Sequence, residues 1–187
     1  MRRWSRSILL LLITCAAVAL ALTLTRRHSC DLDALMVEDI LMPSDWLRVG
    51  RVLPPVLPKE GAHDALAVVY ANDSDTAQHE VYRYATELSA FLYLRINKQV
   101  FFPSGLWYWS EMEGTGDLPL SGDEARILCA RSNDPTLRTV GTLCTAVVRY
   151  GPDISVFSAP LRPPELSETT FSGIVVGIDH RFESCGD

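Results

Sequence analysis

Two β-rich runs around a cluster of turn residues decide the fold of this chain: CTAVVRY (residues 144–150) and ISVFSA (residues 154–159), separated by Gly151-Pro152-Asp153. Both runs contain the β-branched and aromatic residues that strands favour, and the three residues between them are typical of a turn. The pattern predicts an antiparallel hairpin. It also indicates that the second half of the chain is built mainly of strands.

The sequence around this hairpin predicts more strands and a closing helix. Further strands are expected at residues 100–102, 105–109 and 125–130. Prolines 160, 163 and 164 end the sheet, and a helix is predicted over residues 168–183, with Ser167 as its N-cap. Its apolar stripe consists of Phe171, Ile174, Val175, Ile178 and Phe182.

The first half predicts a mixture of short strands and helices. A short helix is expected over residues 31–41, with Leu32, Leu35, Met36 and Ile40 on one face, and strands are expected over 46–53 and 65–71. A longer helix is predicted over residues 76–97, because Val81, Ala85, Leu88 and Leu92 recur at helical spacing and Asp75 with Gln78 resembles a capping box. The fold class is therefore α+β: an antiparallel sheet flanked by two main helices and preceded by an N-terminal apolar helix.

Residues 1–28 have the composition of an export signal or a membrane anchor. Residues 8–25 carry no charge and have arginines on both sides, and a helix of this length spans about 27 Å, close to the hydrocarbon thickness of a bilayer. Two alternatives remain open: cleavage after Ala19-Leu20-Ala21, and lipidation at Cys15. Each places residues 29–187, one domain by their length, outside the cytoplasm, either in the cell membrane with the N-terminus inside or secreted.

The charge of the predicted domain argues against nucleic acid as a partner. The first 28 residues hold five of the seventeen basic residues and no acidic one, so the remainder carries twelve basic and twenty-three acidic residues. Such a surface repels phosphate backbones and anionic headgroups.

Cysteine usage agrees with export. Besides Cys15, the chain has four cysteines, an even number that is typical of disulfides in an oxidising compartment. We favour pairing Cys129 with Cys144, which lie in neighbouring strand-like stretches, and Cys30 with Cys185, which lie at the two ends of the domain. A zinc site is the alternative, but the sequence has no C-x-x-C pair, and we expect no metal.

No catalytic pattern stands out. His79-Glu80-Val81-Tyr82-Arg83 has the start of a zinc-protease motif, but Arg83 replaces the second histidine. His79 is therefore expected to face solvent near the start of its helix. His63-Asp64 would form a metal or acid–base cluster with it only if the fold brought them together, and Glu111 with Glu113 are the remaining candidates for a carboxylate couple.

The strongest binding candidate is aromatic: Trp107-Tyr108-Trp109. In a strand, Trp107 and Trp109 point one way and Tyr108 the other. The two tryptophans either pack under the predicted helix 76–97 or form a platform for a ligand, a partner or the bilayer interface.

Three stretches carry a resemblance to a family: residues 41–46 (LMPSDW), 144–151 (CTAVVRYG) and 178–181 (IDHR). In these, the exported part resembles uncharacterised secreted or membrane-anchored bacterial proteins, over residues 32–185. Its order of elements is similar to domains of the PsbP and Mog1 type, which implies an α+β fold of a kind whose members mostly bind or scaffold partners.

We therefore expect an exported, non-enzymatic binding or scaffold domain without a cofactor. Its expected partners are the membrane, through residues 8–25 if these are retained, and a protein at the membrane surface. Two alternatives are an accessory subunit of a membrane complex and a metal-dependent hydrolase that uses His63 and His79.

Overall fold

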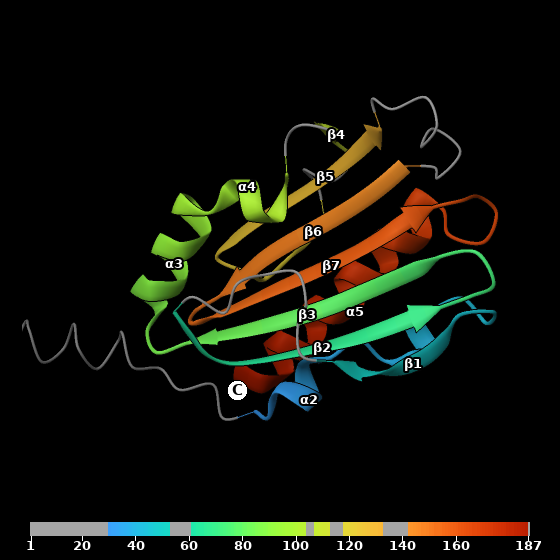
Figure 1. The fold of residues 1–187 in the computed structure, drawn as a ribbon. Coiled ribbons are helices and arrows are strands. Elements are labelled where there is room, and N and C mark those ends of the chain that lie inside the picture. The colour runs from blue at the N-terminus through green and yellow to red at the C-terminus, as the bar shows by residue number, and fades with distance from the viewer. Residues whose placement is uncertain (1–29, 53–60, 104–106, 113–117, 133–141, 187) are drawn as a thin grey trace, which may run out of the picture.

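Seven antiparallel strands form one sheet in the computed structural model, which describes residues 30–52, 61–103, 107–112, 118–132 and 142–186 (Figure 1). The strands are β1 (Leu47–Val52), β2 (Ala62–Ala71), β3 (Thr76–Tyr84), β4 (Trp107–Glu111), β5 (Glu124–Ser132), β6 (Thr142–Tyr150) and β7 (Asp153–Leu161). Their order in the sheet is β1-β2-β3-β7-β6-β5-β4. The helices are α2 (Leu32–Leu35), α3 (Glu87–Ile96), α4 (Lys98–Phe101) and α5 (Glu168–Gly186), with one 3-10 turn, η1 (Asp39–Leu41). The predicted α+β class is confirmed.

The predicted hairpin is confirmed as β6 and β7 at the centre of the sheet. Tyr150 lies opposite Asp153, and Cys144 lies opposite Ala159. Gly151 adopts a φ of 56° in the turn, a backbone conformation that favours glycine. A tight turn of this kind fixes the register of the two strands.

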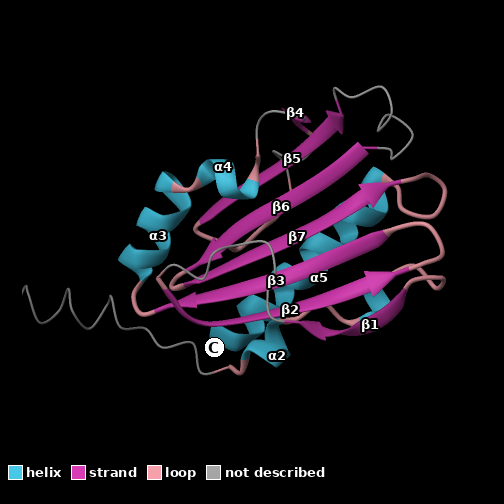
Figure 2. Cartoon of the chain, in the orientation of Figure 1, coloured by secondary structure: helices cyan, strands magenta, loops and turns pink. Residues whose placement is uncertain are grey.

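The two faces of the sheet are covered differently, and β3 shows which residues belong to each. Its alternate residues Ala77, His79 and Val81 point to the side that we call the α5 face. Gln78, Glu80, Tyr82 and Tyr84 point to the opposite side, the α3 face. In Figures 1 and 2, α5 lies behind the sheet, while α3 and α4 lie together at one end of it.

The α5 face contains the main core. The predicted apolar stripe of α5 is confirmed: Phe171, Ile174, Val175, Ile178 and Phe182 are all buried. Ser167 caps the helix, since its Oγ accepts a hydrogen bond from the backbone N–H of Thr170 at 3.2 Å. Each large side chain buried here stabilises the fold by about 1.5–3 kcal/mol. Burial of these α5 residues against the sheet therefore provides much of the stability of the main core.

The predicted helix over residues 76–97 is wrong in its first half. Residues 76–84 form strand β3, and the helix begins only after Thr86, whose Oγ1 accepts from the backbone N–H of Ser89. A central strand covered on both faces lacks the plain apolar–polar alternation that marks a half-exposed strand. The helical spacing that included Val81 was therefore accidental.

The expected capping box at Asp75 and Gln78 is also wrong, since both residues belong to a hairpin. The side chain of Asn72 accepts hydrogen bonds from the backbone N–H groups of Ser74 at 3.0 Å and Asp75 at 2.8 Å, and so shapes the turn between β2 and β3.

Two smaller predictions need correction as well. Residues 31–41 form α2 and η1 rather than one helix, and Ile40 is 86% exposed instead of packing with Leu32. The break follows Met36, which has an extended backbone, and the next backbone N–H, that of Val37, donates to the side chain of His79. The strand expected at residues 100–102 is instead the end of helix α4 and the residue after it.

Both favoured disulfides are present, Cys30–Cys185 and Cys129–Cys144. The first closes 155 residues and the second 15 residues between directly opposed positions of β5 and β6. In the chain-entropy model such loops stabilise the folded state by about 5 and about 3 kcal/mol. Two disulfides support an extracytoplasmic location.

The predicted anchor, residues 8–25, lies outside the described residues. Within the part of the chain that the structure describes, no helix has the length and apolar character needed to cross a bilayer.

Candidate ligand-binding cleft

The α3 face is covered only in part, and a cleft lies beside its covered end. Helices α3 and α4 pack a small core against the sheet that includes Tyr82, Leu94 and Phe101. Beyond this core, an open cleft has a volume of about 220 Å³. Its lining comes from β3, α4, β4, β6 and β7 and consists of Gln78, Glu80, Val100, Phe101, Pro103, Trp107, Trp109, Leu143, Thr145, Val156 and Ser158.

The floor of the cleft is polar, and Glu80 is its only ionisable side chain among the described lining residues. Glu80 is 5% exposed; one carboxylate oxygen accepts from the Tyr82 hydroxyl at 2.6 Å, and the other accepts from the Gln78 amide. Burial raises the pKa of Glu80, and the hydrogen bond from Tyr82 partly opposes that rise. Beside it, the hydroxyls of Thr145 and Ser158 lie 2.9 Å apart.

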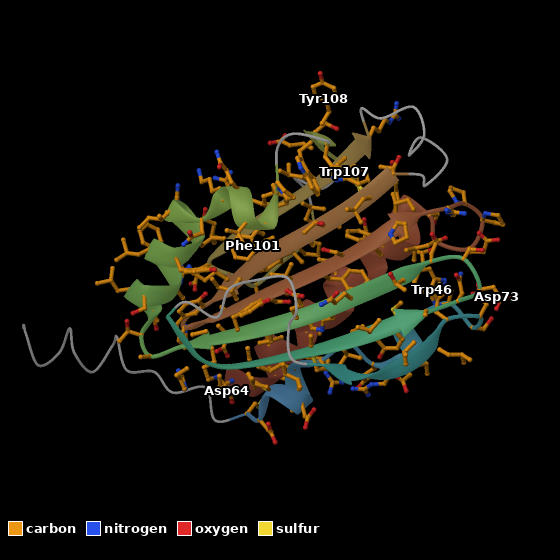
Figure 3. The ribbon with its side chains drawn as sticks, viewed as in Figure 1. Trp46, Asp64, Asp73, Phe101, Trp107 and Tyr108 are labelled. Atoms are coloured by element: carbon orange, nitrogen blue, oxygen red, sulfur yellow. A yellow bond between two sulfur atoms is a disulfide. The ribbon has the colours of Figure 1, made fainter. Side chains whose placement is uncertain are left out.

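The wall of the cleft is aromatic. Trp107 and Trp109 point from β4 to the cleft side, whereas Tyr108 is 73% exposed and projects from the sheet edge (Figure 3). Trp109 is fixed by its indole N–H, which donates to the carbonyl of Pro103 at 2.8 Å, and by an edge-to-face contact with Phe102 at 5.3 Å.

The tryptophans do not pack beneath a helix of residues 76–97, because residues 76–84 of that stretch form strand β3. They instead form a wall together with Phe101 at the end of α4 and Pro103 beyond it. A ligand-binding role for Trp107, Tyr108 and Trp109 stays a prediction. The geometry favours the two tryptophans over Tyr108, since only they line the cleft.

His79, the neighbour of Glu80, points into the opposite face and is completely buried. Its Nδ1 accepts from the backbone N–H of Val37 at 2.9 Å, so its Nε2–H donates to the Ser155 hydroxyl at 2.9 Å. Burial, with a smaller effect of the positive charge of Arg181, lowers the pKa of His79 to about 3. The expectation of a solvent-facing His79 was wrong because the residue lies in a central strand, not on a helix.

The structure does not assemble the hydrolase candidates. His63 is exposed at the start of β2, while His79 lies in the α5 core and is already saturated with hydrogen bonds. Among the described residues, no three histidine, cysteine or carboxylate side chains are grouped closely enough to hold a metal ion. Glu111 is exposed on β4, and its expected partner Glu113 lies outside the described residues.

A second hollow, of about 310 Å³, lies at the turn between β2 and β3 and has a mostly acidic rim. Its one cation among the described residues, Arg162, pairs with Asp75 at 2.9 Å. Asn72, which also lines it, is committed to shaping the turn. Arg162, Asp75 and Asn72 are thus engaged with groups of the protein itself.

Sequence reasoning missed the floor of the cleft. Gln78 and Glu80 were assigned to a helix, so their alternation with Ala77 and His79 was not used. The useful signal was the run from Gln78 to Tyr84, in which polar and aromatic residues share one face at a period of two.

An antiparallel sheet covered on one side by a long helix, with a cleft on the other side, makes this chain an α+β domain, and its two disulfides support an extracytoplasmic location. Among solved structures, the fold is similar to the extracellular domain of PknH from Mycobacterium tuberculosis, with a TM-score of 0.57 and 9% sequence identity. The match covers 81% of this chain and 94% of that one. At this identity the likeness shows the fold alone.

No model of a known protein family matches the sequence, and no curated protein matches it either. The comparisons therefore assign no family. The resemblance to domains of the PsbP and Mog1 type stays a prediction.

Proposed function

We propose that this protein is a binding domain on the outer side of the membrane, which takes a small ligand into the cleft of the α3 face and has no catalytic activity of its own. The observation that carries the proposal is the position of Glu80: a buried carboxylate at the floor of an open cleft whose wall is aromatic. Binding sites combine a mostly apolar lining with a few placed polar groups in this way.

Three further observations support the proposed location. The two disulfides suit an oxidising compartment, and residues 8–25 have the length of a membrane span. The similar fold is that of an extracellular domain. We propose that residues 8–25 hold the domain at the membrane, where a protein partner would respond to the occupied cleft.

A screen of small soluble compounds, followed by ligand-observed NMR on the oxidised full-length protein, tests this function. Compounds of cleft size should bind the natural protein and the Tyr108→Ala variant equally, because Tyr108 lies outside the cleft. Binding should fall at least tenfold in Trp109→Ala, which loses part of the wall. Hits that bind Trp109→Ala as well as the natural protein would contradict the proposal.

A further inference from the structure

We infer that the cleft accepts a small organic cation of the alkylammonium class, whose alkylated positive head lies between Glu80 and the aromatic wall of Trp107 and Trp109. The inference rests on the proposed function, because it concerns the same cleft. It adds the charge and the chemical class of the ligand.

The charge of the cleft is the first argument. Of the described residues that line it, Glu80 alone is ionisable, and no arginine or lysine is among them. The two groups that donate to its carboxylate, the Gln78 amide and the Tyr82 hydroxyl, are both neutral. An ionised Glu80 is therefore buried without a counter-charge, a state that folding alone does not favour. A cationic ligand would provide that counter-charge, whereas an anion would be repelled.

Two other buried acids of the domain, Asp153 with a charged partner and Asp179 with neutral ones, do not line this cleft. Asp153 is completely buried, and both of its oxygens accept from the guanidinium of Arg83 at 2.9 Å. Asp179, also buried, accepts from the backbone N–H of Ser121 at 2.9 Å and from the Tyr150 hydroxyl at 2.8 Å. Glu80 differs from both because it lines a cleft that a ligand can enter.

The aromatic wall selects among cations. Tryptophan has the most favourable ring face for a cation, and alkylated ammonium groups are recognised by aromatic side chains of this kind. A bare metal ion prefers several oxygen ligands, but the cleft offers one carboxylate with two hydroxyls and an amide around it. With a volume of about 220 Å³ and a mostly apolar lining, the cleft suits a compact cation whose charge is surrounded by alkyl groups.

Choline and its uncharged carbon analogue 3,3-dimethylbutan-1-ol provide a matched pair of probes, since they share size and shape and differ in charge. Each would be titrated into the oxidised full-length protein, prepared without choline-containing lipid, by isothermal calorimetry and tryptophan fluorescence. We expect choline to bind at least tenfold more tightly than the neutral analogue. Equal affinity, or no binding of choline at millimolar concentration, would overturn the inference.

Two glutamate variants test whether the preference for choline depends on Glu80. Glu80→Gln keeps the shape of the side chain and should reduce choline affinity at least tenfold, while leaving the weak binding of the neutral analogue unchanged. Glu168→Gln, at an exposed position of α5, makes the same change in net charge and should leave both affinities unaltered. Equal losses in the two variants would mean that choline responds to the overall charge of the domain, and would also overturn the inference.

The two proposals fail in different ways. If neutral compounds bind in a way that depends on Trp109 but choline binds no more tightly than its neutral analogue, the cleft is a ligand site but not one for cations. If no compound of either kind depends on Trp109, the proposed function itself fails.

Discussion

His79 and Glu80 are neighbours on β3, and both are buried, but they serve opposite faces of the sheet. His79 lies in the sealed α5 face, is neutral, and has a hydrogen-bond partner at each ring nitrogen. Glu80 lies in the partly open α3 face and has only neutral partners for its carboxylate. The polar group of the α5 face therefore has its partners within the core, whereas that of the α3 face is the one to which our proposal assigns a role in binding.

The same contrast extends to the rest of each face. On the α5 side, the Tyr150 ring stacks on Phe182 at 4.0 Å, and its hydroxyl donates to the buried Asp179. Both contacts lie within the buried core. On the α3 side, Trp107 and Trp109 remain partly exposed around the cleft. Substitutions on the two faces should therefore affect different measurements.

The largest effect is expected from His79→Ala. It would leave a cavity in the core and remove the acceptor of the buried Val37 N–H, so we expect a loss of about 3–5 kcal/mol in the free energy of unfolding. Urea denaturation measures this loss. The exposed His63→Ala is the matched control and should change stability by less than about 0.5 kcal/mol. A loss of less than 1 kcal/mol for His79→Ala would contradict the stabilising role that we assign to His79.

A pH titration should show a smaller effect of the same residue. The pKa of His79 falls from 6.5 to about 3 on folding, so its contribution to stability is present above pH 6.5 and is lost as the pH falls towards 3. Linkage gives about 1.4 kcal/mol per pH unit, or about 2–3 kcal/mol at pH 4.5.

Glu80 changes stability with pH in the opposite direction, because its pKa is raised on folding. Its contribution to the free energy of unfolding is present below pH 4.5 and is lost as the pH rises through the folded-state pKa. The histidine effect is therefore best measured by adding His79→Gln to a Glu80→Gln protein and following unfolding from pH 7 to 4.5. The double variant should lose stability less steeply on acidification. Parallel profiles would refute the role given to His79.

Trp109→Ala tests the α3 face, where we expect a substitution to affect binding more than stability. Its ring contact with Phe102 and its hydrogen bond to Pro103 lie at the surface, so we expect a loss of about 1 kcal/mol in stability. The variant should nevertheless lose most ligand binding. A loss of stability as large as that of His79→Ala would show that the wall belongs to the core.

The parts of the fold that could be predicted from sequence were those with a strong local pattern. The Gly151-Pro152-Asp153 turn, the stripe of α5 around Phe171 and the pairing of Cys129 with Cys144 each depend on neighbouring or periodic residues. Strand β3 could not be predicted in this way, because tertiary contacts on both of its faces determine its structure.

The candidate site depended on that strand. Trp107 and Trp109 stand out in the sequence as a surface platform or a packed pair, but Glu80 becomes a cleft residue only when β3, β6 and β7 lie side by side. The position of Glu80 in the cleft therefore could not be predicted without the order of the strands.

The most direct test of the account is the free energy of unfolding of Glu80→Gln at pH 8, measured in urea beside the natural protein. Glutamine keeps the shape of the side chain and removes a buried charge that has no counter-charge. Its oxygen can accept from Gln78 and its NH2 can donate to the Tyr82 hydroxyl oxygen, so the account predicts equal or greater stability, by up to about 1 kcal/mol. A loss of about 2 kcal/mol or more would contradict it, because Glu80 would then be a structural residue like His79.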